Sequence, residues 1–201
     1  MWLIRFYTGG FATMAKYTKK AMMDTFLELL ETKSVDKITV KDIVETCGIN
    51  RNTFYYYYAD IYELLDDVLV TQTEEGLEKI GDCSSFYEEY INTAALVINY
   101  KQAILHLFNS KTRDAFEKYL ETIIISFIER FVRKAAQGHN LTDEDITYIS
   151  RFYAYFVTGS TIRWIKDGMK NVQEDVIRDI SDSFDATIED MIAERESKHN
   201  R

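Results

Sequence analysis

The amino-acid sequence predicts an all-α protein, and three observations lead to that class. The chain of 201 residues contains no proline and only 8 glycines, the two residue types that most disfavour helices. Apolar residues recur at spacings of three and four from one end to the other, which is the period of an amphipathic helix. No stretch of useful length alternates as a strand would. We therefore expect about nine helices, arranged as a three-helix N-terminal domain and a helical-bundle C-terminal domain.

The composition is typical of a globular protein, with 46% hydrophobic and 14% aromatic residues. A chain of this length buries one good core or two small ones. Cys47 and Cys83 have no metal-like or redox-like spacing, and two cysteines argue against a secreted disulfide framework. We expect Cys47 to be a small core residue. No run of about 18 apolar residues occurs, so we expect no membrane helix and a cytoplasmic protein.

The first residues are expected to lie outside the folded domains. Residues 1–13 precede Met14, and the basic stretch Ala15–Lys20 after it is typical of a natural start. The opening segment is too short and too lightly charged for a convincing signal peptide. We predict that residues 1–13 are a disordered or non-native N-terminal extension, and that the first helix runs from Thr18 to Thr32.

The stretch from Thr39 to Tyr58 has the features of two short helices that meet at a tight corner. Thr39 and Asn50 are N-cap residues, and Asp42 completes a capping-box pattern with Thr39. Gly48 lies between the two runs, where a left-handed turn is needed. The pattern is that of a helix-turn-helix.

The outer surface of these two helices carries groups that suit DNA. Phe54 and Tyr58 lie one turn apart and are expected to face inward, which leaves polar and phenolic side chains outside. A guanidinium, an amide, hydroxyls and phenols can bind base edges and phosphates at a major groove. Arg51 and Asn52 are the expected base contacts. The predicted DNA-binding residues are Lys19, Thr39, Lys41, Asn50, Arg51, Asn52, Thr53, Tyr55 and Tyr56.

The residues Ile38–Glu45 and Cys47–Tyr58 closely resemble the N-terminal domain of TetR-family transcription regulators. The resemblance implies a helix-turn-helix DNA-binding domain over residues 14–62. Two departures stand out. Many relatives carry a lysine near Asp60, where a phosphate contact is expected, and relatives often have a glycine at the position of Asn52.

The rest of the chain, residues 63–201, is expected to form a helical effector-binding and dimerisation domain. The expected helices begin at Asp60 and then cover 84–99, 101–108, 112–137, 142–166 and the residues from 172 onward. The acidic run after Thr142 is explained as helix capping, and we expect no metal there. The segment Phe152–Met169 resembles the C-terminal domain of a Firmicutes-type branch of the family, which includes regulators of dihydroxyacetone kinase genes.

The two final helices carry long apolar faces that need to be covered. Pairing with the same helices of a second copy, as a four-helix bundle, would bury them. The predicted dimer interface consists of Phe152, Phe156, Ser160, Ile177, Ile180, Phe184 and Ile188.

The expected C-terminal domain, residues 63–201, which we call the body, is also rich in aromatic residues. Aromatic stripes at helical spacing are more often plain core, but the resemblance implies an effector cavity for a flat or amphipathic small molecule. The predicted pocket residues are Tyr87, Tyr90, His106, Phe108, Phe116, Tyr119, Phe127 and Trp164. We expect His106 to be a satisfied core or pocket histidine and not a catalytic one.

The net charge of −9 is unevenly distributed. Residues 14–60 hold seven Lys/Arg and seven Asp/Glu, and residues 1–13 add only Arg5, so residues 61–201 carry −10. An acidic body with a neutral head suits a protein that approaches DNA by one end, although an ordinary acidic domain has the same balance.

The sequence gives little support to catalysis. It has no phosphate-binding loop and no nucleophile elbow, and its histidines are far apart. We expect no enzyme, cofactor or metal. The favoured function is a ligand-responsive repressor that binds a palindromic double-stranded DNA operator as a homodimer. The alternatives are a transcriptional activator controlled by a protein co-regulator and a helical small-molecule-binding protein with weak DNA affinity.

Overall fold

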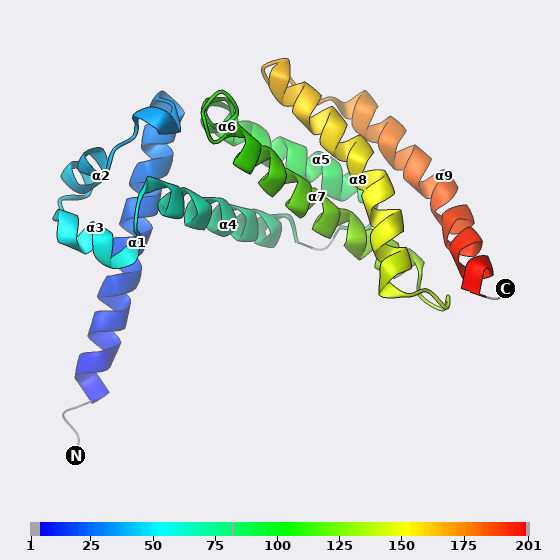
Figure 1. The fold of residues 1–201 in the computed structure, drawn as a ribbon, viewed down its shortest axis with the longest axis horizontal. Helices are drawn as coiled ribbons and strands as arrows, with labels where there is room; N and C mark the ends of the chain where they lie inside the picture. Colours follow the sequence, from blue (N-terminus) through cyan, green and yellow to red (C-terminus); the bar gives the residue numbers. More distant parts are fainter. Residues whose placement is uncertain (1–4, 82, 200–201) are drawn as a thin grey trace. The chain divides into compact units, whose positions relative to one another are not determined.

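The computed structural model describes residues 5–81 and 83–199, with backbone alone for residues 5–16 and 199 (Figure 1). The all-α prediction is confirmed, and no strand occurs in these ranges. The α-helices are α1 (Arg5–Thr32), α2 (Val40–Cys47), α3 (Arg51–Tyr57), α4 (Ile61–Ile80), α5 (Phe86–Val97), α6 (Lys101–Phe108), α7 (Arg113–Ala135), α8 (Asp143–Lys166) and α9 (Glu174–His199). Two 3₁₀ turns, η1 (Val35–Lys37) and η2 (Ile98–Tyr100), join helices.

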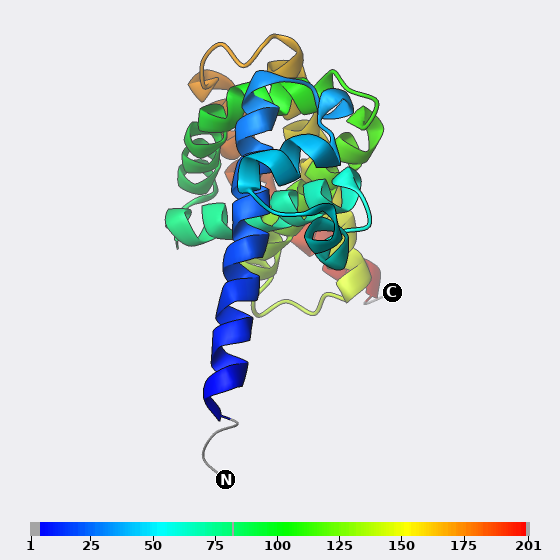
Figure 2. The same ribbon diagram turned by 90° about the vertical axis from the view of Figure 1, so that its left-hand side faces the viewer.

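Most helix bounds agree with the sequence pattern, and the start of α1 does not. The helix begins at Arg5, so the predicted start at Thr18 is wrong. The two adjacent glycines at positions 9 and 10 lower helix propensity but do not end the helix. Both views show the first turns of α1 extending beyond α2 and α3 (Figures 1 and 2). Residues 1–4 lie outside the described part of the chain, and a non-native origin for residues 1–13 stays a prediction.

The chain divides into two compact units. Unit 1 comprises Met1–Lys79 with Gln102–Ser110, and unit 2 comprises Ile80–Lys101 with Lys111–Arg201. Unit 1 therefore contains α4 up to Lys79 and most of α6 beside the N-terminal helices, and the assignment of residues 14–62 to DNA binding and 63–201 to effector binding and dimerisation stays a prediction. Two residues of α4, Leu64 and Val68, are almost completely buried.

The core of unit 1 holds the helix-turn-helix against α1. Met22, Phe26 and Leu30 form the buried stripe of α1, at the spacing of one helical face. The fully buried Ile43 of α2 and Phe54 of α3 come from the two short helices. Burial of large apolar side chains thus fixes two helices that are too short to be stable alone.

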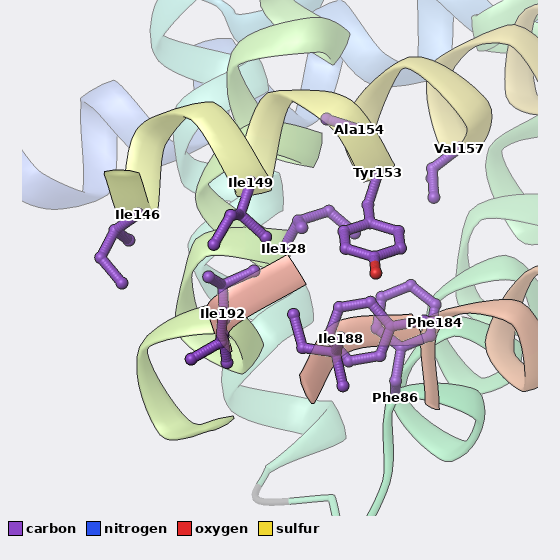
Figure 3. Packing of buried hydrophobic residues seen from close by; sticks show 11 residues of the cluster. Phe86, Ile128, Ile146, Ile149, Tyr153, Ala154, Val157, Phe184, Ile188 and Ile192 are labelled. Carbon is purple, nitrogen blue, oxygen red and sulfur yellow. The ribbon is translucent and has the colours of Figure 1, made fainter. Parts of the chain in front are cut away.

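The core of unit 2 lies among α5, α7, α8 and α9 (Figure 3). At its centre Phe86 of α5 stacks on Phe184 of α9, with ring centroids 4.8 Å apart. Tyr153 of α8 packs edge-on against Phe184 and forms a hydrogen bond with Thr187 of α9 at 2.8 Å. The buried positions Ile146, Ile149 and the others labelled in Figure 3 extend this core along α8 and α9.

Candidate nucleic-acid interface

The capping box at the start of α2 fixes the first helix of the motif. The Thr39 hydroxyl accepts a hydrogen bond from the Asp42 backbone N–H at 3.2 Å, and Asp42 Oδ2 accepts from the Thr39 backbone N–H at 2.9 Å. Lys33 Nζ lies 2.9 Å from the same Asp42 oxygen. The hydrogen bonds from Lys33 and then Thr39 lower the pKa of Asp42 from 3.8 to about 2. The predicted capping box is confirmed, and the Thr39 side chain is used in capping the N-terminus of α2.

The corner between α2 and α3 depends on Gly48. Its backbone is left-handed, with φ 65° and ψ 31°, and its N–H donates to the carbonyl oxygen of Val44. A β-carbon at this position would contact nothing within 4 Å, so the requirement for glycine is one of backbone conformation alone. The half-buried Cys47 beside it lies with its sulfur 3.2 Å from the Thr25 hydroxyl of α1.

The start of α3 is set by Asn50. Its side-chain oxygen accepts hydrogen bonds from the Thr53 backbone N–H at 2.8 Å and from the Thr53 hydroxyl at 3.2 Å. The predicted N-cap is confirmed, and the polar atoms of Asn50 and Thr53 already have one another as partners. Phe54 and Tyr58 are buried as expected, which fixes the orientation of the helix.

The outward face of α3 is the surface formed by Arg51, Asn52, Tyr55 and Tyr56. All four side chains are exposed, and Tyr56 remains 81% accessible although it is a large aromatic residue. Arg51 forms no ion pair with any residue that the structure describes. This face presents one free guanidinium, one amide and two phenols on a short helix that is held at both ends.

The lysines around the motif are engaged with carboxylates. Lys41 Nζ lies 3.7 Å from Glu45, and Lys19 Nζ lies 2.9 Å from Asp67. The Lys41 pair is highly exposed, and exposed pairs of this kind contribute little, so a phosphate can replace its carboxylate. Lys19 differs, because its carboxylate partner is held by a second hydrogen bond from Tyr58.

The predicted pocket residues are distributed over both units. His106 and Phe108 lie in unit 1, where His106 Nδ1 is 2.6 Å from the Leu30 carbonyl oxygen. In unit 2 Tyr90 and Phe127 pack together, with ring centroids 6.5 Å apart.

The polar ends of the pocket residues have local partners. Tyr87 receives a hydrogen bond from Arg178, and the Trp164 indole donates to the Asn171 carbonyl oxygen at 2.6 Å. Phe116 is buried and Tyr119 is partly buried. A pocket lined by all eight residues stays a prediction.

Several residues predicted for the dimer interface pack within the chain, and the interface itself stays a prediction. Ile177, Phe184 and Ile188 are each at most 5% exposed, and Phe184 and Ile188 pack inside the core of unit 2. Ile180 is partly buried against the same core, and Ser160 forms a hydrogen bond with Tyr90 at 3.0 Å. These side chains already have partners within the chain.

The exposed aromatic surface lies instead on α8. Phe152 and Phe156, which were predicted, are 45% and 61% exposed. Tyr148 and Tyr155, which sequence reasoning missed, are 50% and 63% exposed. Offsets of four, seven and eight residues from Tyr148 place all four on one helical face, so the helical period was the signal that could have found them. We call this surface the aromatic stripe of α8.

The described residues show neither a metal-binding cluster nor a membrane-spanning helix. No group of three or more His, Cys, Asp or Glu side chains is placed to hold a metal ion. None of the helices found there has both the length and the apolar character needed to cross a membrane.

Comparisons with known proteins agree with this geometry. Residues 23–68 match the family model described as bacterial regulatory proteins, tetR family, and residues 84–186 match the model described as transcriptional regulator C-terminal region. The solved structure of a dihydroxyacetone kinase operon activator, DhaS, superposes with a TM-score of 0.67. That likeness covers 85% of this chain and 96% of the other at 21% identity, and it shows the fold.

The curated relatives are matched over a smaller share of their own length than the solved structure is. The HTH-type dhaKLM operon transcriptional activator DhaS of Lactococcus lactis is 31% identical over 41% of this chain and 42% of its own length. Two uncharacterized HTH-type transcriptional regulators of Bacillus subtilis also match. YvdT is 23% identical over 65% of this chain and 72% of its own length, and YxbF is 26% identical over 46% and 23%. The matches thus span less than half the length of two of these three relatives.

Proposed function

The chain belongs to the tetR family of bacterial regulatory proteins and is a helix-turn-helix transcriptional regulator, and we propose that it binds a palindromic DNA operator as a homodimer. The observation that carries this proposal is the outward face of α3. Its four exposed side chains, Arg51, Asn52, Tyr55 and Tyr56, stand on a helix whose inward side is fully used in packing.

The chemistry of that face suits a major groove. The Arg51 guanidinium can bind guanine O6 and N7 in bidentate fashion, and the Asn52 amide can pair with adenine. The two phenols can donate to phosphates, which fixes the register on the duplex. Lys41 can reach a phosphate by leaving its exposed pair with Glu45, while Thr39, Asn50 and Thr53 support the surface through their caps.

The aromatic stripe of α8 supports the homodimer. The stripe places four exposed aromatic side chains on one helical face, and protein interfaces are enriched in aromatic residues. A two-fold axis through this face would bring the stripe against its own copy. Two recognition helices would then meet two half-sites about one DNA turn apart.

We further propose that the regulator is a repressor whose operator affinity falls when a small molecule binds in the helical body. The physical basis is linkage, since a ligand that binds one conformation more tightly shifts the population toward it. A second candidate is an activator controlled by a protein co-regulator, because the relative and the solved structure named DhaS are both described as activators.

Selection from a random duplex library tests the proposal. The full-length protein is expected to recover a palindromic consensus whose affinity falls steeply as salt rises, because phosphate contacts release counterions. Failure to recover any consensus at low salt would overturn it and favour the helical small-molecule-binding protein. Reporter transcription from the selected operator then separates repressor from activator.

A further inference from the structure

Three helices of unit 1 meet at one carboxylate oxygen. The Tyr58 hydroxyl donates to Asp67 Oδ2 at 2.6 Å, and Lys19 Nζ lies 2.9 Å from the same oxygen. Lys19 belongs to α1, Asp67 belongs to α4, and Tyr58 is the residue that caps the C-terminal end of α3. Lys19 Nζ also lies 5.9 Å from the centroid of the Tyr58 ring. We name these three residues the Asp67 latch.

The latch connects the recognition helix to α4 beyond the local turn. Asp60 and Glu63 cap the start of α4 through neighbouring backbone N–H groups, so they fix only the turn itself. Asp67 lies on a later turn of α4 and reaches back to the end of α3. A rotation or shift of α4 must therefore move Tyr58 or break this bond.

The bond between Tyr58 and Asp67 is shielded from solvent. Tyr58 is 3% exposed, and the Asp67 carboxylate is partly screened. Burial opposes ionisation of this carboxyl group, but the hydrogen bonds from Lys19 and Tyr58 prevail and lower the pKa of Asp67. Charge-assisted hydrogen bonds are shorter and stronger than neutral ones.

The latch also changes the role of Lys19. A lysine on the first helix of a DNA-binding domain is expected to contact phosphate. The Lys19 ammonium is already paired with the Asp67 carboxylate, which the Tyr58 hydroxyl also holds in place. Leaving that carboxylate would cost Asp67 one of its two charge-stabilising partners. The geometry is that of a residue that positions the recognition helix.

We propose that Asp67, with Lys19 and Tyr58, is a positioning element that sets the angle of α3 on α4, and thereby the half-site spacing that the dimer accepts. This inference rests on the proposed function, because it assumes operator binding through α3. It assigns to Lys19 an indirect role in DNA binding, through Asp67.

The test uses full-length wild type and the variants Asp67→Asn, Tyr58→Phe and Lys19→Met. Each is titrated against operators that carry two copies of the selected half-site with different spacers. Asp66→Asn is the matched control for Asp67→Asn. Asp66 is an exposed neighbour on α4, and both substitutions remove one negative charge. Thermal unfolding by circular dichroism confirms that each variant is folded at the binding temperature.

We expect the wild type and Asp66→Asn to share one sharp spacing preference. The latch variants should bind the best operator about five- to tenfold more weakly, a loss within the range of one typical intramolecular hydrogen bond, and should accept a broader range of spacers. The double variant Tyr58→Phe/Asp67→Asn should lose less than the product of the two single losses, because both remove the same bond.

The salt dependence of Lys19→Met distinguishes the two roles of the lysine. A positioning residue leaves the slope of log affinity against log salt unchanged, whereas loss of a phosphate contact reduces its magnitude by about 0.9 per protomer. An unchanged spacing preference in all three variants, or a reduced slope for Lys19→Met, would overturn the latch. A wild type that selects no consensus would instead contradict the proposed function.

Discussion

The side-chain oxygen of Asn50 accepts two hydrogen bonds from Thr53, one from the backbone N–H at 2.8 Å and one from the hydroxyl at 3.2 Å. This pair fixes the first turn of α3. Arg51 and Asn52 follow the cap directly, so their side chains lie on the exposed first turn of the recognition helix. The orientation of these two side chains therefore depends on the Asn50 cap.

Loss of the Asn50 cap should destabilise the fold. We expect Asn50→Ala to lower the free energy of unfolding by about 0.5–2 kcal/mol, because the Thr53 N–H loses its partner, and Asn50→Ser to retain most of the stability. Urea denaturation measures both. Asn52→Ala is the matched control on the same turn, with an expected change within about 0.5 kcal/mol. Equal losses for Asn50→Ala and Asn52→Ala would show that the cap is not important.

The capping box of α2 should give the protein a pH-dependent stability. The pKa of Asp42 falls from 3.8 to about 2 on folding, through Lys33 and then Thr39. Because the folded value is the lower one, the ionised carboxylate stabilises the fold above about pH 4, and this contribution is lost as the pH falls toward 2.

The variant Asp42→Asn tests this dependence. We expect it to be about 1 kcal/mol less stable than the wild type at pH 7, with a difference that shrinks between pH 4 and pH 2. Glu45→Gln removes a carboxylate from an exposed pair on the same helix, and it should change stability by less than about 0.5 kcal/mol. A difference for Asp42→Asn that stays constant down to pH 2 would contradict the assignment.

Two phenylalanines that the sequence assigns to the dimer interface should differ in their effect on folding. Phe184 is buried and stacked on Phe86, so Phe184→Ala should cost about 3–5 kcal/mol of unfolding free energy. Phe156 is 61% exposed in the aromatic stripe of α8, so Phe156→Ala should leave the folding of the single chain nearly unchanged. Chemical denaturation of both variants under dilute conditions checks the difference. Similar losses for the two would contradict the assignment of Phe184 to the core.

The same stripe predicts the behaviour of the dimer. Phe156→Glu places a charge where two copies of the stripe would meet, and an unpaired charge is costly to bury in an interface. Analytical ultracentrifugation should give twice the 23.6 kDa chain mass for the wild type and the single-chain mass for the variant. Lys118→Glu, an exposed change on α7, is the control and should remain dimeric. A dimeric Phe156→Glu protein would place the interface elsewhere.

Local signals in the sequence were sufficient for the recognition motif. Thr39 with Asp42, Gly48 and Asn50 each act within four residues, so their spacing alone specifies a cap or a left-handed turn. The predicted helix over residues 101–108 was found for the same reason, since its limits are set by its own apolar pattern.

Long-range packing was less predictable. Helical spacing shows that Ile177, Phe184 and Ile188 share an apolar face of α9, but it does not show whether that face meets α8 of the same chain or a second copy. The aromatic stripe of α8 was partly missed because this helix is apolar on more than one side. In the Asp67 latch, Lys19 of α1 is far in sequence from Tyr58 and Asp67, and no local pattern indicates that these three residues meet.

The relative affinity for every single-base variant of the selected operator, measured for wild type and Arg51→Ala, tests the central claim most directly. If Arg51 reads a base edge, the wild type should discriminate at one position in each half-site, and Arg51→Ala should lose about 1–3 kcal/mol per half-site and accept all four bases there. If Arg51→Ala retains the wild-type preference at every position, the outward face of α3 does not read the operator through this residue, and the proposed recognition is contradicted.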